Sequence, residues 1–119
     1  MPWAVLFHDD FRAEYQALDE DVQDVLLAAL ERLRAVGPAL GRPRVDTLSG
    51  SRHANMKELR FGAKDQEWRV AFAFDPSRNA VVLVGGAKSG ISQRQFYRRL
   101  LTIADERFDD HLASIARRP

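Results

Sequence analysis

The chain opens with a short apolar run that leads into a helical pattern. Residues 3–7 are apolar and are followed by a histidine and two aspartates. This pattern predicts a strand and then a helix cap, with Asp9 or Asp10 accepting a backbone N–H at the start of a short helix that runs to about Leu18. The N-terminal part therefore begins as a strand followed by a helix.

A second helix is predicted over residues 19–36. Its apolar residues recur at spacings of three and four, and acidic residues occupy its first turn, where the helix dipole favours negative charge. Gly37 and Pro38 stop it. Residues 37–54 then contain several glycines and prolines and no sustained period, which indicates a long loop of the kind that is usually functional or mobile.

Three strands are predicted next, over about 55–61, 67–74 and 80–87. Residues 62–66 and 75–79 form the intervening turns, and the Asp-Pro and Asn residues of the second turn suit that conformation. The third strand is apolar on both faces, as expected for a strand inside a sheet. The order of elements predicts an antiparallel meander.

The first two of these strands pair as a hairpin whose register follows from their apolar rows. Burying both rows on one side fixes the parity of the pairing, and the simplest register sets Leu59 beside Val70 and Arg60 directly opposite Arg69. Like charges that face each other across a ladder are mildly destabilising. We interpret the retained pair as an open cationic shelf that binds an anion.

The last predicted element is the longest. Ser92 and Gln95 match a capping box, and the helix that follows carries an apolar stripe that includes Tyr97. Neither a repeat nor a low-complexity segment interrupts the sequence, so residues 1–119 are expected to form one α+β domain.

Composition excludes several classes of protein. The chain is 45% hydrophobic and 29% charged, has no cysteine, and carries a net charge of +1, which is not the strongly basic balance of a protein that coats nucleic acid. It has no apolar run near the length of a membrane span and no signal-peptide pattern at its start, so a cytoplasmic protein is expected. Acidic residues concentrate in residues 9–31 and basic residues mostly between 32 and 99. Such a bipolar surface can hold an anion on one side, or it can be two ordinary solvated faces.

The candidate chemical groups converge on one end of the sheet. Arg60 and Arg69 face each other, Lys88 follows the third strand, and Tyr97 opens the next helix. Two guanidiniums, an ammonium and a phenol can bind a phosphodiester and stabilise its transition state. Two registers of the last strand pair are possible, and only one places Lys88 on the arginine face.

Structural readings of the same residues stay open. The arginines can be solvated with Glu58 and Glu67 as partners, Lys88 can be a turn residue, and Tyr97 can be a core tyrosine. Carboxylates or histidines do not cluster beside the basic group, so neither a metal site nor a cofactor is expected.

Four segments of the sequence are informative when they are taken in order. They are HANMKELRF, WRVAFAFD, GAKSG and a helix that opens with FY. Together these segments resemble the RelE/HigB superfamily of toxins from bacterial type II toxin–antitoxin systems, and most closely its phage-derived HigB-like branch. The resemblance covers about residues 3–112. It implies a RelE-like α+β fold with an N-terminal strand and helical hairpin, a three-stranded antiparallel meander, and a long C-terminal helix.

The resemblance further implies a metal-independent endoribonuclease that cleaves messenger RNA, usually on the ribosome, by attack of the ribose 2′-hydroxyl on the adjacent phosphate. Position by position, the catalytic residues it implies are Arg60, Arg69, Lys88 and Tyr97. The candidates for binding RNA are Lys57, His53 and Arg94.

Departures from the family pattern leave other functions open. Glu58 stands where relatives often have a basic residue, and Ser89 stands where some have another. The alternatives are a ParE-like toxin that inhibits DNA gyrase and a non-catalytic module that binds nucleic acid or protein. For a toxin, the expected partners are messenger RNA, the ribosome and a cognate antitoxin, of helix-turn-helix type and encoded separately, with no membrane.

Overall fold

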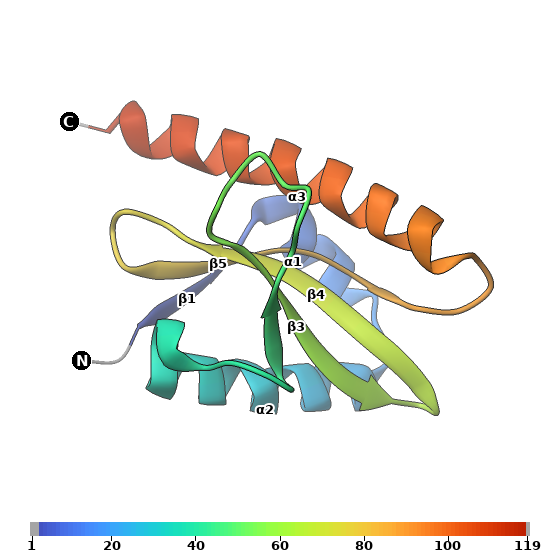
Figure 1. The fold of residues 1–119 in the computed structure, drawn as a ribbon. Helices are drawn as coiled ribbons and strands as arrows, with labels where there is room; N and C mark the ends of the chain where they lie inside the picture. The colour runs from blue at the N-terminus through green and yellow to red at the C-terminus, as the bar shows by residue number, and fades with distance from the viewer. Residues whose placement is uncertain (1–2, 119) are drawn as a thin grey trace.

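The computed structural model describes residues 3–118. Its sheet lies between two helical layers, with α3 on one face and α2 on the other (Figure 1). The elements are, in chain order, β1 (Ala4–Phe7), α1 (Asp9–Gln16), α2 (Glu20–Val36), the 3-10 turn η1 (Gly37–Ala39), β2 (Val45–Thr47), β3 (Met56–Ala63), β4 (Gln66–Phe74), β5 (Asn79–Ala87) and α3 (Gln93–Ala116).

The predicted meander is confirmed and forms the centre of a larger sheet. The strand order is β1-β5-β4-β3-β2, in which β1 pairs parallel to β5 and the remaining neighbours are antiparallel. Strand β5 therefore lies inside the sheet, as its two apolar faces predicted. Strands β1 and β2 form the two edges.

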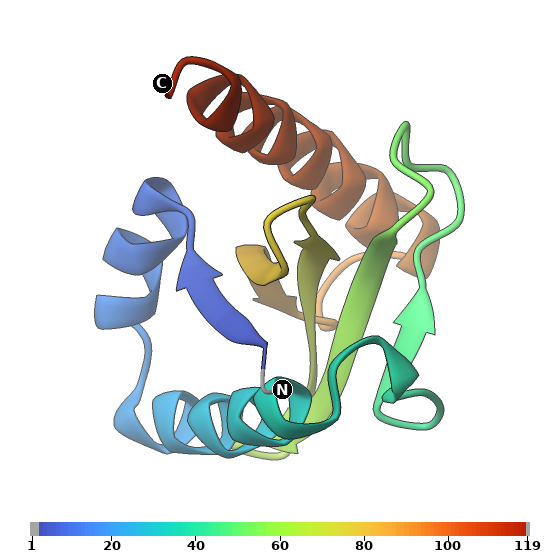
Figure 2. The same ribbon diagram turned by 90° about the vertical axis from the view of Figure 1, so that its left-hand side faces the viewer.

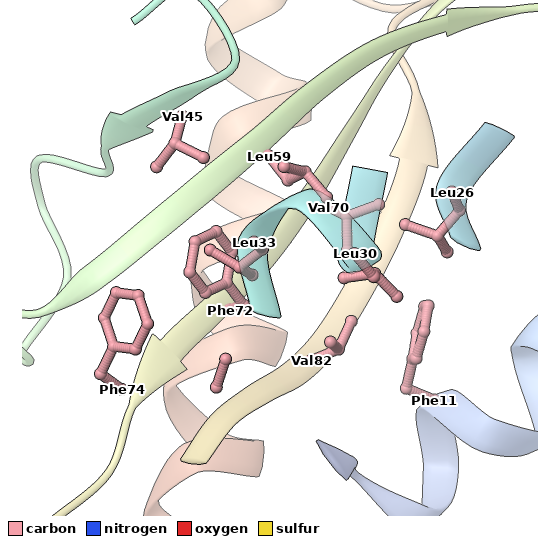
Figure 3. Close-up of a cluster of buried hydrophobic side chains, with 11 residues drawn as sticks. Phe11, Leu26, Leu30, Leu33, Val45, Leu59, Val70, Phe72, Phe74 and Val82 are labelled. Atoms are coloured by element: carbon pink, nitrogen blue, oxygen red, sulfur yellow. The ribbon is translucent and has the colours of Figure 1, made fainter. Parts of the chain in front are cut away.

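Helices α1 and α2 cover one face of the sheet. Their apolar residues pack with the alternate residues of β3, β4 and β5 into a single cluster, which Figure 3 shows in close-up. Leu26 and Leu33 of α2 are fully buried in this cluster, together with Phe72 of β4. The three- and four-residue spacing of the apolar positions in α2 is thus the spacing of the residues that contact the sheet.

Helix α3 lies over the opposite face of the sheet (Figure 2). Phe96, Leu100, Ala104 and Phe108 are buried against the other row of sheet residues, in a second core cluster. The side-chain oxygen of Ser92 accepts the backbone N–H of Gln95, which confirms the predicted N-cap. The start of α3, which carries the candidate residue Tyr97, is therefore anchored by a cap and by a buried apolar stripe.

Three local predictions differ from the structure. The cap of α1 is His8, whose Nδ1 accepts the N–H of Asp10, so the two aspartates lie inside the first turn. The segment 37–54 is not all loop, because Val45–Thr47 pair with β3 as an edge strand. The turn between β3 and β4 contains only Lys64 and Asp65, and both strands are longer than predicted.

The turn between β3 and β4 requires a left-handed backbone. Lys64 and Asp65 have φ values of 55° and 61°, the conformation of tight hairpin turns that favour glycine. The β3–β4 register therefore forms despite, rather than because of, the side chains at this turn.

Each of the three histidines pairs with an aspartate, and each pair fixes α3 or a segment beside it. His8 Nε2 lies 2.9 Å from Asp110 Oδ2. His53 Nε2 lies 2.7 Å from Asp109 Oδ1 and His111 Nε2 lies 2.8 Å from Asp75 Oδ2. These contacts attach the C-terminal half of α3 to the start of α1, to the segment before β3, and to the β4–β5 turn.

Asp65→Gly should stabilise the fold, because glycine adopts the positive φ of this turn without a steric penalty. We expect the free energy of unfolding to rise by about 0.5–1 kcal/mol in urea denaturation. The matched control is Gln66→Gly, where the added backbone freedom falls inside β4 and should lower stability. A destabilised Asp65→Gly protein would contradict the assigned turn.

The fold should lose stability in acid through Asp75. Burial acts to raise the pKa of this carboxyl, but hydrogen bonds from His111, Asn79 and Ser77 together lower it below its ordinary value. A lowered folded-state pKa contributes stability above the unfolded pKa of about 4, and this contribution is lost as the pH falls toward the folded value. Urea denaturation between pH 6 and about pH 3 should show a smaller loss for Asp75→Asn than for the parent. Equal losses would show that Asp75 is not the titrating group.

Candidate functional site

The β3–β4 hairpin places two arginines opposite each other on the α3 face. The register pairs Arg60 with Arg69 and Leu59 with Val70, as predicted from the apolar rows. Leu59 and Val70 lie in the core cluster under α2, so the alternation of side chains turns both arginines toward α3.

The predicted open cationic shelf is not what the structure shows, because the carboxylate of Glu58 occupies it. Glu58 is two residues before Arg60, on the same face of β3, and it is only 4% exposed. Its Oε2 accepts a hydrogen bond from Arg60 Nη2 at 3.1 Å, and its Oε1 lies 3.6 Å from Arg69 Nε. A buried carboxylate thus lies between the two guanidiniums and offsets their mutual repulsion.

The two arginines have different environments. The side chain of Arg69 is 10% exposed, and its Nη1 donates to the carbonyl oxygen of Trp68 at 2.9 Å while its Nη2 approaches Glu67 at 3.4 Å. The side chain of Arg60 is 32% exposed, and its Nη2 also reaches Asp46 of β2 at 3.3 Å. Arg69 is therefore held in place from several directions, whereas Arg60 lies at the surface of the site.

Both arginines keep one unused donor. The Nε atoms of Arg60 and Arg69 are buried and have no hydrogen-bond partner among residues 3–118. A buried donor without a partner costs about 1–3 kcal/mol. Such groups are uncommon in folded proteins, and here both belong to the guanidiniums that lie against the carboxylate of Glu58.

Tyr97 and Lys88 complete the cluster from α3 and from the end of β5. The hydroxyl of Tyr97 donates to Glu58 Oε1 at 2.7 Å, and Lys88 Nζ lies 5.5 Å from the centre of the Tyr97 ring. The β4–β5 register pairs Arg69 with Gly86, so of the two registers left open by the sequence, the one that places Lys88 on the arginine face is present.

The environment keeps the two titratable donors protonated. Burial, followed by the hydrogen bond to Glu58, raises the pKa of the Tyr97 phenol above its ordinary value. The hydrogen bond to Glu58 raises the pKa of Arg60 as well. Tyr97 and Arg60 therefore act at neutral pH as hydrogen-bond donors, not as bases.

A polar cavity of about 350 Å³ opens beside this cluster. Sequence reasoning missed most of its walls, because residues 37–54 were read as a loop and Gln93 was not among the candidate residues. The residues that line it are Asp46, Thr47, Leu48, Ser49, Glu58, Arg60, Gln93 and Tyr97. The segment after Arg44 thus supplies one wall, the hairpin the floor, and the start of α3 the other wall.

Three further candidates lie outside the cluster. Lys57 alternates with Glu58, so it lies on the α2 face, where its Nζ donates to Thr47 at 2.9 Å. His53 pairs with Asp109, twelve residues beyond Tyr97 on α3, which is about 18 Å of helix rise. Arg94 is exposed in the first turn of α3 and is not among the residues that line the cavity.

Two general properties of the described residues bear on ligands. Within residues 3–118, no group of three or more histidine, cysteine, aspartate or glutamate side chains is placed to hold a metal ion. The same residues include no helix that is both long and apolar enough to span a membrane.

Comparison with known proteins identifies the family. Residues 13–109 match the family described as "phage derived protein Gp49-like". The chain is 50% identical over 97 residues to "Putative toxin HigB2" of Mycobacterium tuberculosis, an alignment that covers 81% of this chain and 48% of that relative, so it spans about half of the relative's length. It is 39% identical over 111 residues to "Putative toxin HigB3" of the same organism, covering 93% of this chain and 95% of the relative.

The fold has a counterpart among solved structures. A mutant of the E. coli toxin RelE in the free state superposes with a TM-score of 0.60 at 13% sequence identity, covering 86% of this chain and 96% of that one. At this identity the likeness shows the fold, and it confirms the predicted RelE-like α+β architecture. The sequence matches and the shared fold together establish that this chain belongs to the phage-derived Gp49-like family, within the RelE/HigB superfamily.

Proposed function

We propose that this protein is the toxin of a type II toxin–antitoxin system and arrests translation by cleaving messenger RNA, on the ribosome and without a metal ion. Family membership supports the toxin assignment. The ribonuclease assignment rests on one observation. At the wall of a polar cavity, the carboxylate of Glu58 contacts the side chains of Arg60, Arg69 and Tyr97. A separately encoded antitoxin would restrain this activity.

Glu58 is the group best placed to act as general base. In the proposed reaction, the ribose 2′-hydroxyl gives its proton to a Glu58 oxygen and its oxygen attacks the adjacent phosphorus. The bond from phosphorus to the 5′ oxygen breaks, which leaves a 2′,3′-cyclic phosphate and a 5′-hydroxyl. Tyr97 or Lys88 supplies the proton of that hydroxyl. Both lie on the side of Glu58 that faces α3.

Arg60 and Arg69 have different roles in the proposed reaction. Arg60 is exposed at the cavity and can exchange Glu58 for a phosphate oxygen, which frees Glu58 Oε2 to accept a proton. Arg69 is buried behind Glu58 and is a positioning residue that holds the carboxylate toward the cavity. This division differs from the expectation that both arginines contact the scissile phosphate directly.

Charge in the site changes in step with the reaction. When Glu58 takes the proton, one negative charge beside the two guanidiniums disappears. At the same stage the phosphorane gains a second negative charge, so the guanidiniums face more charge on the substrate and less on the protein. The arginines thus stabilise the transition state more than the bound substrate.

Glu58→Gln should abolish most of the cleavage while the fold persists. Glutamine preserves the shape and can still bond to Tyr97, but it cannot accept the proton. General-base catalysis contributes about 10²–10⁴-fold, and we expect a loss in that range in single-turnover cleavage of message on translating ribosomes, with 5′ ends mapped by primer extension.

The matched control is Glu67→Gln, an exposed carboxylate beside Arg69 that lies outside the cavity. It should cleave at the parental rate. Parental cleavage by Glu58→Gln would remove Glu58 from the mechanism. Growth arrest with intact messages and accumulating DNA breaks would refute the ribonuclease and favour a ParE-like action on gyrase.

Arg69→Ala should lower stability as well as activity, because it leaves one side of a buried carboxylate without its partner. We expect the free energy of unfolding to fall by about 2 kcal/mol in urea denaturation, with a smaller loss for the more exposed Arg60→Ala. Adding Glu58→Gln to Arg69→Ala should recover part of that loss, because the uncompensated charge is removed. Additive losses in the double variant would show that the two groups are not coupled.

A further inference from the structure

A second cavity, of about 270 Å³, lies on the α2 face at the β3 edge. We call it the arginine groove and define it by three arginines, Arg32, Arg44 and Arg60, above a floor that includes Val25, Leu40 and Phe61. Arg32 comes from α2, and Arg44 lies directly before β2. Three separate parts of the chain therefore contribute arginines to the lining of one groove, although the guanidinium of Arg60 pairs with Glu58 and Asp46 on the α3 side of the sheet.

Two of the three arginines of the groove have no acidic partner. The lining contains no carboxylate, and Arg60 pairs with Glu58 and Asp46 outside it. Arg32 and Arg44 are exposed, and within residues 3–118 neither makes an ion pair. Arg34, two residues further along α2, instead pairs with Glu31 and lines a different cavity. Self-repulsion among uncompensated arginines is tolerated where an anion binds.

The groove and the cavity of the proposed active site share one lining residue. Arg60 lines both cavities, which lie on opposite faces of the sheet. Strand β2 begins only at Val45, paired with Leu59, so β3 has no neighbouring strand on that side from Phe61 onward. A chain that leaves the active-site cavity at Arg60 can therefore pass around this short edge and enter the groove.

We propose that the arginine groove is a second RNA subsite, which binds a nucleotide of the strand that continues from the scissile phosphate. This inference rests on the proposed function and extends its substrate path. Arg32 and Arg44 bind the phosphate, and the base lies on the apolar floor beside the partly exposed Phe61. Guanidinium forks combined with an aromatic and aliphatic floor are the usual means of holding single-stranded RNA without reading its sequence.

The test measures binding of a 2′-O-methyl RNA oligonucleotide, which cannot be cleaved because its attacking hydroxyl is blocked. Fluorescence anisotropy across a NaCl series gives the affinity and its salt dependence. The Arg32→Ala/Arg44→Ala double variant should bind about tenfold more weakly, and the slope of log affinity against log salt should shrink by about 0.7 for each lost contact. Arg34→Ala is the control of equal charge on the same helix and should leave both quantities unchanged.

Three results would overturn the inference. These are an unchanged affinity and slope in the double variant, an equal loss in Arg34→Ala, and displacement of the RNA by poly-glutamate of the same charge as effectively as by unlabelled RNA. The last would mark the groove as a docking surface for acidic protein. This outcome can be told apart from that of the ribonuclease test. If the parent protein binds the oligonucleotide through the groove but leaves messages uncut, only the proposed reaction is contradicted. A protein that cuts messages while its double variant binds normally contradicts only the groove.

Discussion

The carboxylate of Glu58 is the interaction on which this site depends. Without it, the register that buries the apolar rows of β3 and β4 would force two guanidiniums together on a face covered by α3. With it, Arg69 can be buried and Arg60 can stay at the cavity wall. A single acidic residue therefore allows the hairpin to keep its hydrophobic register and its two cations together. The carboxylate itself is buried between them.

The fold brings this carboxylate its partners from distant parts of the chain. The hairpin supplies the arginines by strand alternation, while Tyr97 arrives on α3. Helix α3 is held in turn by an apolar stripe and by hydrogen bonds between histidine and aspartate near its far end. Because α3 is a rigid rod, attachment at the far end also fixes the position of the phenol at its start. Packing far from the cavity is thus part of how the site is positioned.

The sequence alone predicted the elements whose apolar residues repeat at a regular spacing over many positions. The apolar rows of β3 and β4 determine their register, and the stripes of α2 and α3 identify their buried faces. Strand β2 was missed because only three residues pair and only Val45 of them is buried. The role of Glu58 was missed for another reason. Alternation places it beside Arg60, but whether the arginines bend inward to it or outward to solvent depends on the cover that α3 provides. Histidine capping of α1 was hidden because aspartates, the stronger cap residues by preference, follow directly.

The two cavities share Arg60, which lies beside the start of the short strand β2. A longer edge strand would pair with β3 beyond Arg60 and cover the edge that the proposed RNA path crosses. Instead, β2 starts opposite Leu59, and the chain before it contributes Arg44 to the groove and Asp46 to the active-site wall. Asp46 also pairs with Arg42 and Arg60. At this edge, arginines that have an acidic partner therefore lie close to Arg44, which has none among residues 3–118. An RNA phosphate that displaces the carboxylate partners of Arg60 would thus meet, on the next nucleotide, arginines that have no partner to give up. Under the proposed function, this charge pattern would hold the RNA strand most tightly in the arginine groove and least tightly at the proposed point of cleavage, where the products leave.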